Sequence, residues 1–176
     1  TELIYAAHQV KNIDNNRIET VIQLKDPLYP VFVNLNFTAY QKENVICQSV
    51  SISHQEKNKL AVENIASAYL PLRADSYYLT HFHGAWASEM QLVEEQLTPG
   101  VKRVESKKGI RTTQSENSSF LLSLNGPANE DMGEVYAGSL AWLGNYLSSF
   151  EIDECGLLHV MSGMNDFAST YNLEPG

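Results

Sequence analysis

The sequence has little cysteine, little positive charge and no long apolar run. Its two cysteines, Cys47 and Cys155, allow one disulfide at most, and because each lies in an alternating apolar stretch we expect buried free thiols. No apolar run approaches the roughly 18 residues of a membrane span, so we expect no membrane partner. With 12 basic against 21 acidic residues the net charge is −9, which disfavours binding to nucleic acid phosphates.

Motifs for nucleophilic and phosphate chemistry are also missing. There is no Gly-x-Ser-x-Gly turn and no glycine-rich run before a helix, and no pattern indicates a cofactor. The sequence starts at Thr1 without a charged-then-apolar leader, which together with the lone thiols favours a cytoplasmic location. The missing initiator Met and the final "LEPG" suggest a piece of a longer protein.

The pattern that is present is alternation with a period of two. The 176 residues suffice for one domain with its own core, and β-branched and aromatic residues are frequent in the alternating segments. Turn signals such as "KDPLYP" and "NGPANEDMG" separate them. The sequence therefore predicts an all-β antiparallel sandwich or barrel. The clearest predicted strands cover 17–24, 30–40, 44–53, 120–124, 134–143, 146–153 and 157–163.

Two polar segments are less regular. Residues 88–97 are the only plausible helix, but their apolar residues form no clean stripe, so we expect a strand or irregular structure. Residues 101–119 are rich in Lys and Arg. They predict a solvated loop, with a docking arm for another domain as the alternative.

Candidate catalytic groups are few. His81 and His83 could bind a metal from one strand face, but no third ligand has a convincing spacing, so packed or surface histidines are favoured. Glycoside hydrolysis needs two carboxylates that face each other across a sugar ring, and no such pair stands out. The available acidic residues are Glu130, Asp131, Glu134, Glu151, Asp153 and Glu154.

Aromatic residues are the feature most typical of a ligand site. Trp86, Tyr136, Trp142 and Tyr146 could stack on a sugar, or they could fill a core or a domain interface. Alternation places Glu134 on the same face as Tyr136 and Trp142, where a buried carboxylate would need a partner. The residues alone therefore indicate an all-β domain with a carbohydrate-related role as one interpretation.

Several motifs, in matching order, resemble those of a known family. Together they resemble the N-terminal domain of the α-galactosidases of glycoside hydrolase family 36. Ser88, Glu89 and Met90 depart from the Arg-Glu-Arg of the family, and Asp166 replaces a proline, which leaves the substrate preference open. The motifs are "TAYQKENVI" at 38–46, "GAW" at 84–86, "PGVKRVESKKG" at 99–109, "EDMGEVYAGSLAWLGN" at 130–145, "EIDECG" at 151–156 and "LEPG" at 173–176.

The resemblance implies a fold and a function. Residues 1–176 would form part of an antiparallel β-supersandwich, similar to galactose mutarotase, of a retaining enzyme that removes terminal α-galactosyl groups from oligosaccharides. The catalytic β/α barrel, which carries both catalytic aspartates in the family, would be absent from this chain and would be its partner domain. We therefore expect no catalytic residue, cofactor or metal here and no hydrolase activity of the chain alone. Family members often form tetramers, which implies a homo-oligomer.

The resemblance also suggests where a domain interface or sugar-facing surface would lie. Tyr136 and Trp142 are then expected to pack, and Glu134 to accept a structural hydrogen bond. A free-standing carbohydrate-binding module and a domain of an α-N-acetylgalactosaminidase are the alternative functions. The residues expected at the interface or facing sugar are Trp86, Glu134, Tyr136, Asn145 and Asn165.

Overall fold

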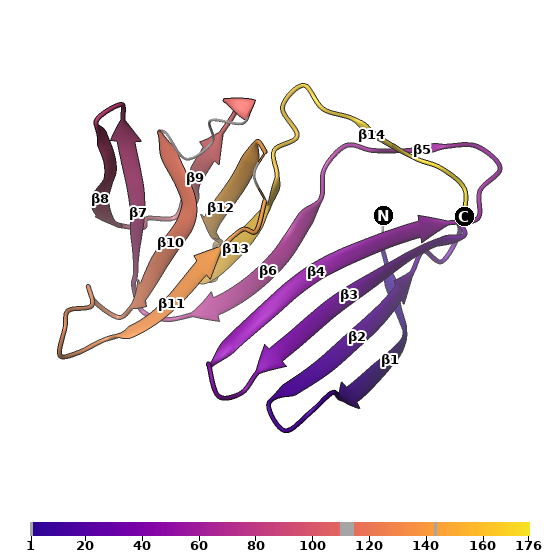
Figure 1. The fold of residues 1–176 in the computed structure, drawn as a ribbon, viewed down its shortest axis with the longest axis horizontal. Coiled ribbons are helices and arrows are strands. Elements are labelled where there is room, and N and C mark those ends of the chain that lie inside the picture. Colours follow the sequence, from indigo (N-terminus) through magenta and orange to yellow (C-terminus); the bar gives the residue numbers. More distant parts are fainter. Residues whose placement is uncertain (1, 110–114, 143) are drawn as a thin grey trace. The chain divides into compact units, whose positions relative to one another are not determined.

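A computed structural model describes residues 2–109, 115–142 and 144–176 (Figure 1). The structure is built from β-strands, and every strand pair is antiparallel, as the alternation predicts. The strands are β1 (Ile4–Asn12), β2 (Arg17–Lys25), β3 (Val31–Tyr40), β4 (Val45–His54), β5 (Leu60–Val62), β6 (Ala66–Arg73), β7 (Tyr77–Ala85), β8 (Ser88–Gln96), β9 (Gly100–Ser106), β10 (Glu116–Leu124), β11 (Glu134–Ser139), β12 (Tyr146–Ile152), β13 (Leu157–Met164) and β14 (Tyr171–Leu173).

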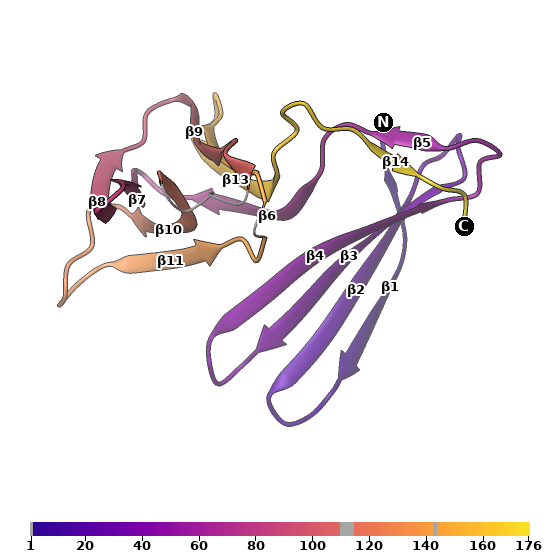
Figure 2. The same cartoon turned by 45° about the horizontal axis from the view of Figure 1, so that its top comes forward.

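The chain divides into two compact units. The first contains residues 1–63 and 168–176, and the second contains residues 64–167. In the first unit β1, β2, β3 and β4 form a four-stranded meander in sequence order, and β14 pairs with β5 in a short ribbon (Figure 2). Because consecutive strands pair through short turns, this sheet is specified by local sequence.

Aspartates shape two of the meander turns. Asp14 accepts hydrogen bonds from the backbone N–H groups of Asn16 and Arg17 at 2.8 Å each. Asp26 accepts the N–H groups of Leu28 and Tyr29 at 2.8 and 3.0 Å, which explains why "KDPLYP" is a turn. These backbone hydrogen bonds are the main reason that the pKa of each carboxyl lies below its usual value.

His54 joins the ribbon to the meander. Its side chain is fully buried, and its Nε2 donates to the Leu173 carbonyl at 3.0 Å. The N–H of Glu56 donates to the Nδ1 of His54 at 3.2 Å. Both ring nitrogens are therefore used, which makes burial of this polar ring tolerable.

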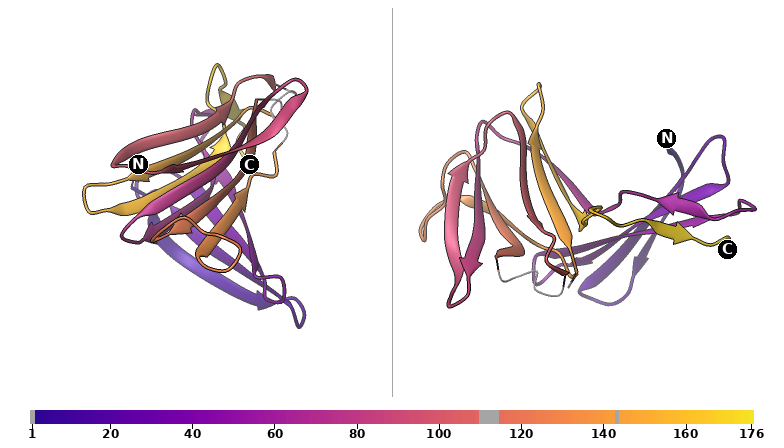
Figure 3. Two further views of the ribbon diagram at one scale, coloured as in Figure 1. Left: turned by 90° about the vertical axis from the view of Figure 1, so that its left-hand side faces the viewer. Right: turned by 90° about the horizontal axis from the view of Figure 1, so that it is seen from above.

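The second unit is a β-sandwich. Its two sheets have the strand orders β11-β10-β7-β8 and β6-β13-β12-β9 (Figure 3). Leu79 and Leu122 of the first sheet and Phe150 and Leu158 of the second belong to one buried cluster, with at most 1% of each residue exposed. Phe120 meets Phe150 edge-to-face across the layers at 4.9 Å between ring centroids. Each fully buried residue of this size contributes about 1.5–3 kcal/mol of transfer free energy.

The structure corrects the interpretation of the basic segment. Residues 101–106 belong to β9 and residues 116–119 to β10, while residues 110–114 lie outside the described residues. In β9 only every second residue faces inward, so Val104 is buried beside the charged Arg103 and Glu105. Because charged residues flank Val104, the alternation of this strand was not recognised in the sequence. Residues 88–97 were expected as strand or irregular structure, and Ser88–Gln96 are indeed β8.

Two smaller expectations were wrong. Both cysteines are free, but both are exposed rather than buried. Cys47 pairs with Thr38 on the polar face of the meander, and Cys155 lies in the turn between β12 and β13. The strand predicted over 134–143 also ends earlier, at Ser139.

Gly138 provides a test of the core. A Cβ at Gly138 would lie 2.2 Å from the Phe120 Cζ, and that ring is held against Phe150. We expect Gly138→Ala to reduce the free energy of unfolding by about 1–3 kcal/mol because the ring must shift inside a packed core. Urea titration followed by circular dichroism would measure the loss. The neighbouring exposed Ala137 supplies the control, Ala137→Ser, and equal stability of both variants would contradict the packing described.

Candidate functional site

Two of the predicted site residues, Asn145 and Asn165, meet at one end of the sheet β6-β13-β12-β9. The Asn145 carbonyl accepts the Trp142 indole N–H at 3.1 Å and the Asn165 backbone N–H at 3.0 Å. The Oδ1 of Asn145 accepts the Gly109 N–H at 2.7 Å. Asn145 therefore ties together the ends of β9 and β13 and the residues that follow β11.

Asn165 has a comparable role beside it. Asn165 is 5% exposed. Its Nδ2 donates to the Glu105 carboxylate at 3.0 Å and to the Tyr146 carbonyl at 3.1 Å. Its Oδ1 accepts the Phe167 N–H at 2.9 Å. Lys107 completes the group by binding Glu105 at 2.8 Å. The pKa of Glu105 is lowered, first by Lys107 and further by Asn165. Asn165 is thus occupied by protein groups.

Glu134 and Tyr136 contact each other on β11. The Tyr136 hydroxyl donates to the Glu134 carboxylate at 2.7 Å, and this bond raises the pKa of Tyr136. Tyr136 is half-buried and packs against the sandwich core, whereas Glu134 is exposed. Trp142 is 46% exposed, and its ring lies over Gly144, where a Cβ would approach the indole Nε1 to 2.6 Å.

Trp86 occupies a different place. It lies in the turn between β7 and β8 with 83% of its surface exposed. Gly84 allows this turn to close, because a Cβ there would lie 2.8 Å from the Glu89 Cα. The tight hairpin therefore presents the indole to its surroundings instead of to the core.

The histidine pair meets a carboxylate that is distant in sequence. The Nδ1 atoms of His81 and His83 lie 3.2 and 2.7 Å from the two oxygens of Glu116 on β10. The His81 Nε2 also lies 3.4 Å from Glu95, which binds Lys102 at 2.5 Å. Lys102, first, and His81 lower the pKa of Glu95. Among the described residues no group of three or more His, Cys, Asp or Glu side chains is arranged to hold a metal ion.

Tyr146 lies buried near this cluster. No part of its surface is exposed, and its hydroxyl has no hydrogen-bond partner. Burial is the main cause of its raised pKa, and the negative charge of Glu116 adds to it. The cluster is a set of polar contacts that reaches the surface at His83, which is 57% exposed. Its partner Glu116 was absent from the sequence argument because a 33-residue separation gives no local signal.

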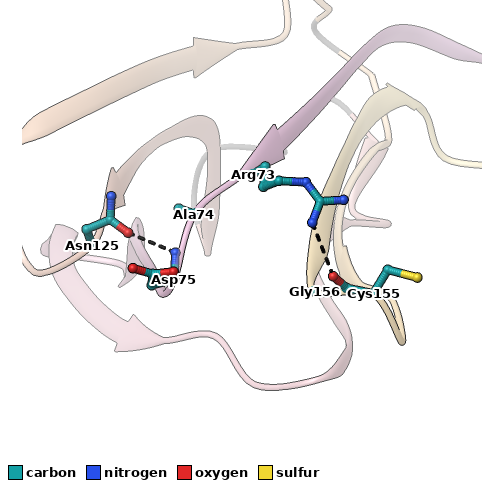
Figure 4. Close-up of a pocket in the computed structure, with 6 residues that line it drawn as sticks. All are labelled: Arg73, Ala74, Asp75, Asn125, Cys155 and Gly156. Atoms are coloured by element: carbon teal, nitrogen blue, oxygen red, sulfur yellow. Dashed lines mark hydrogen bonds between the residues drawn. The ribbon is translucent and has the colours of Figure 1, made fainter.

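A polar pocket opens at the turns of the sandwich. Arg73 and Asp75 lie on one side, Asn125 follows β10, and Cys155 and Gly156 come from the β12–β13 turn (Figure 4). Its volume is about 520 Å³. The Asp75 N–H donates to Asn125 Oδ1 at 2.8 Å, and Arg73 Nη1 contacts the Cys155 carbonyl at 3.5 Å (Figure 4). Asp75 is the only carboxylate among its lining residues, so the pocket lacks the acid pair that glycoside hydrolysis needs.

The described residues contain no helix long and apolar enough to cross a bilayer.

Comparison with known proteins shows the family to which the chain belongs. A model described as the glycosyl hydrolase family 36 N-terminal domain matches residues 1–174, so the chain belongs to that family of domains.

Individual relatives agree with this family. The chain is 34% identical over 155 residues to α-galactosidase AgaA of Geobacillus stearothermophilus, a match that covers 88% of the chain and 21% of that protein. It is 27% identical over 168 residues to α-galactosidase Mel36A of Lactobacillus acidophilus, which covers 96% of the chain and 23% of that protein. The chain thus spans about a fifth of the length of these relatives.

Solved structures give the same result for the fold. The crystal structure of AgaA matches with a TM-score of 0.91 and 30% identity, covering the whole chain and 26% of AgaA. A variant of AgaA has also been solved in complex with raffinose, with the same coverage and TM-score. The antiparallel all-β architecture is therefore that of the N-terminal domain of these enzymes.

A change at Asn165 tests its structural role. Asn165→Asp replaces the amide that donates to Glu105 and to the Tyr146 carbonyl with an acceptor. We expect a loss of about 1–3 kcal/mol in the free energy of unfolding because buried acceptors then face each other. Chemical denaturation at neutral pH would measure it. The exposed Asn58 is the control site. A loss of unfolding free energy in Asn165→Asp no larger than that in Asn58→Asp would refute the assignment.

Asp153 sets the direction in which the stability of the fold changes with pH. It binds His159 at 3.0 Å and the N–H groups of Leu157 and Cys155 at 2.8 Å each. The His159 hydrogen bond, first, lowers its pKa in the folded state. A lowered carboxyl pKa stabilises the fold above the unfolded value, and this stabilisation disappears as the pH falls through the folded value.

We therefore expect the free energy of unfolding to fall below about pH 4, near the usual aspartate pKa. In Asp153→Asn this decrease should be shallower. Denaturant titrations from neutral to acid pH would compare the slopes, with Glu154→Gln in the same turn as the control. Identical acid slopes for wild type and Asp153→Asn would contradict the role assigned to Asp153.

Proposed function

We propose that this chain is the non-catalytic N-terminal β-sandwich domain of a retaining α-galactosidase. The observation that carries the proposal is the family match over residues 1–174, at a fifth of the length of enzymes named α-galactosidases. The parent enzyme removes terminal α-linked galactose from oligosaccharides of the raffinose type. The raffinose complex of an AgaA variant supports this substrate class.

The contacts of the acidic side chains favour a structural role for the domain. Glu105, Asp153 and Glu116 each bind protein groups that hold strands or turns in place. Hydrolysis with retention requires a carboxylate nucleophile and an acid about 5 Å apart across the sugar. That pair belongs to a separate barrel domain of the proposed enzyme. The sandwich contributes a rigid platform next to it.

We also propose a cytoplasmic location for the parent enzyme. Both cysteines are free and exposed. Accessible thiols persist where the compartment is reducing, because oxidising compartments convert them to disulfides.

The activity of the isolated chain tests whether the catalytic groups lie outside it. We expect the 176-residue chain to release no nitrophenol from p-nitrophenyl α-galactoside above the rate of its Trp86→Ala variant. The full-length protein, assayed in parallel, should hydrolyse the substrate. Turnover by the isolated chain above that control would falsify the proposal.

A further inference from the structure

Three turns of the sandwich form the walls of the polar pocket (Figure 4). They are the turn between β6 and β7, the residues that follow β10, and the turn between β12 and β13. The volume of about 520 Å³ lies within the range of roughly 300–1,000 Å³ that is typical of small-molecule sites. The pocket is therefore large enough for a small ligand.

The buried hydroxyl of Tyr77 connects two of these walls. It accepts the Ala74 N–H at 2.9 Å from the β6–β7 turn, and it donates to the Gly156 carbonyl at 2.8 Å in the β12–β13 turn. Only 3% of Tyr77 is exposed, so water does not compete for these hydrogen bonds. Contacts beneath the pocket therefore fix the two turns relative to each other.

The remaining backbone of the pocket is also held by internal hydrogen bonds. The Asp75 N–H donates to the Asn125 Oδ1 at 2.8 Å, and the Asn125 N–H donates to the Ser76 carbonyl at 2.9 Å. On the opposite wall the Cys155 N–H donates to Asp153 at 2.8 Å. Because these bonds exist without a ligand, binding would require little ordering of the walls.

Three polar side chains of the pocket keep groups that the protein does not use. The Asp75 carboxylate accepts no hydrogen bond and forms no ion pair with any described residue. Asn125 uses its Oδ1, which leaves both hydrogens of its Nδ2 for a ligand. Arg73 makes one long contact of 3.5 Å to the Cys155 carbonyl, and no carboxylate in the described ranges pairs with it. The pocket therefore offers one charged acceptor and two donors.

These groups select the chemistry of the ligand. A metal ion would meet the Arg73 guanidinium and only one carboxylate. An anion would be repelled by Asp75 and by a chain with a net charge of −9. A neutral molecule with several hydroxyls suits all three side chains, because each hydroxyl can both donate and accept.

We propose that this pocket is a non-catalytic binding site for a neutral saccharide, with galactose as its simplest ligand. The choice of galactose rests on the proposed function, in which the parent enzyme releases this sugar. One hydroxyl donates to Asp75, while others accept from Arg73 and Asn125. None of the lining residues is aromatic, so binding relies on hydrogen bonds, and we expect an affinity in the roughly millimolar range.

The Cys155 thiol lines the pocket and reports its occupancy in the full-length protein. Alkylation by iodoacetamide, followed by peptide mass spectrometry, measures the reaction rates of Cys155 and Cys47 in the same sample. We expect saturating galactose to slow the alkylation of Cys155 several-fold and to leave Cys47, on the meander, unchanged. Equal rates at Cys155 with and without galactose would overturn the proposal. A Cys155 that does not react even without sugar would overturn it too, because other protein groups would then cover the pocket.

Two further ligands test the specificity of the site. Sorbitol, an open-chain polyol at the same concentration, should slow Cys155 less than galactose does, because its hydroxyls are not held in a ring. Equal slowing by sorbitol would show a general effect of polyols and would contradict the proposal. Slowing by glycine but not by galactose would assign Arg73 and Asp75 to a zwitterion and would contradict it as well.

A matched pair of variants tests the role of Asp75. Asp75→Asn removes the charged acceptor but keeps the backbone N–H that binds Asn125, so galactose should protect Cys155 several-fold less. Glu154→Gln neutralises a carboxyl next to Cys155 that does not line the pocket, and protection should remain. Each rate is compared with that of the same variant without sugar. Undiminished protection in Asp75→Asn would refute the assignment.

The experiment separates this inference from the proposed function. Alkylation of Cys155 does not depend on turnover. A full-length protein that lacks α-galactosidase activity but shows protection by galactose would reject the proposed function and support the pocket. An active enzyme without protection would reject the pocket alone.

Discussion

Burial of apolar side chains between the two sheets of the sandwich is the constraint on which the second unit depends. In the sandwich, Leu79 and Leu122 of one sheet meet Phe150 and Leu158 of the other, and this cluster excludes water from the space between the layers. Backbone hydrogen bonds within each antiparallel sheet satisfy the groups that burial would otherwise leave unpaired. Details such as the absence of a side chain at Gly138 follow from this packing, since the Phe120 ring occupies that space.

Polar side chains act around the core instead of within a reactive centre. Asn145, Asn165 and Glu105 connect the ends of three strands, and Asp153 organises the turn between β12 and β13. A cation, an imidazole or backbone N–H groups bind each of these carboxylates. The acids therefore stay ionised and hold strands and turns in place. This pattern suits a domain that supports an enzyme whose bond-breaking groups lie on other polypeptide.

The alternation of side chains was sufficient to predict the strand content, because the period of two is a property of the backbone. Strands such as Val31–Tyr40 and Leu157–Met164 lie close to their predicted positions, and the family motifs pointed to the correct domain. Charged outward residues hid β9, because the pattern there shows only when the opposite layer is known.

Side-chain partners that are distant in sequence were decided by tertiary structure alone. Glu116 reaches His81 and His83 through strand pairing, and Asn165 reaches Glu105 across 60 residues. Nothing in the sequence near either residue indicates its partner. The exposure of Cys47 and Trp86 depends likewise on which face of the fold each residue takes. Local sequence determines which residues share a strand face, whereas the packing of sheets determines which face meets water and which side chains meet each other.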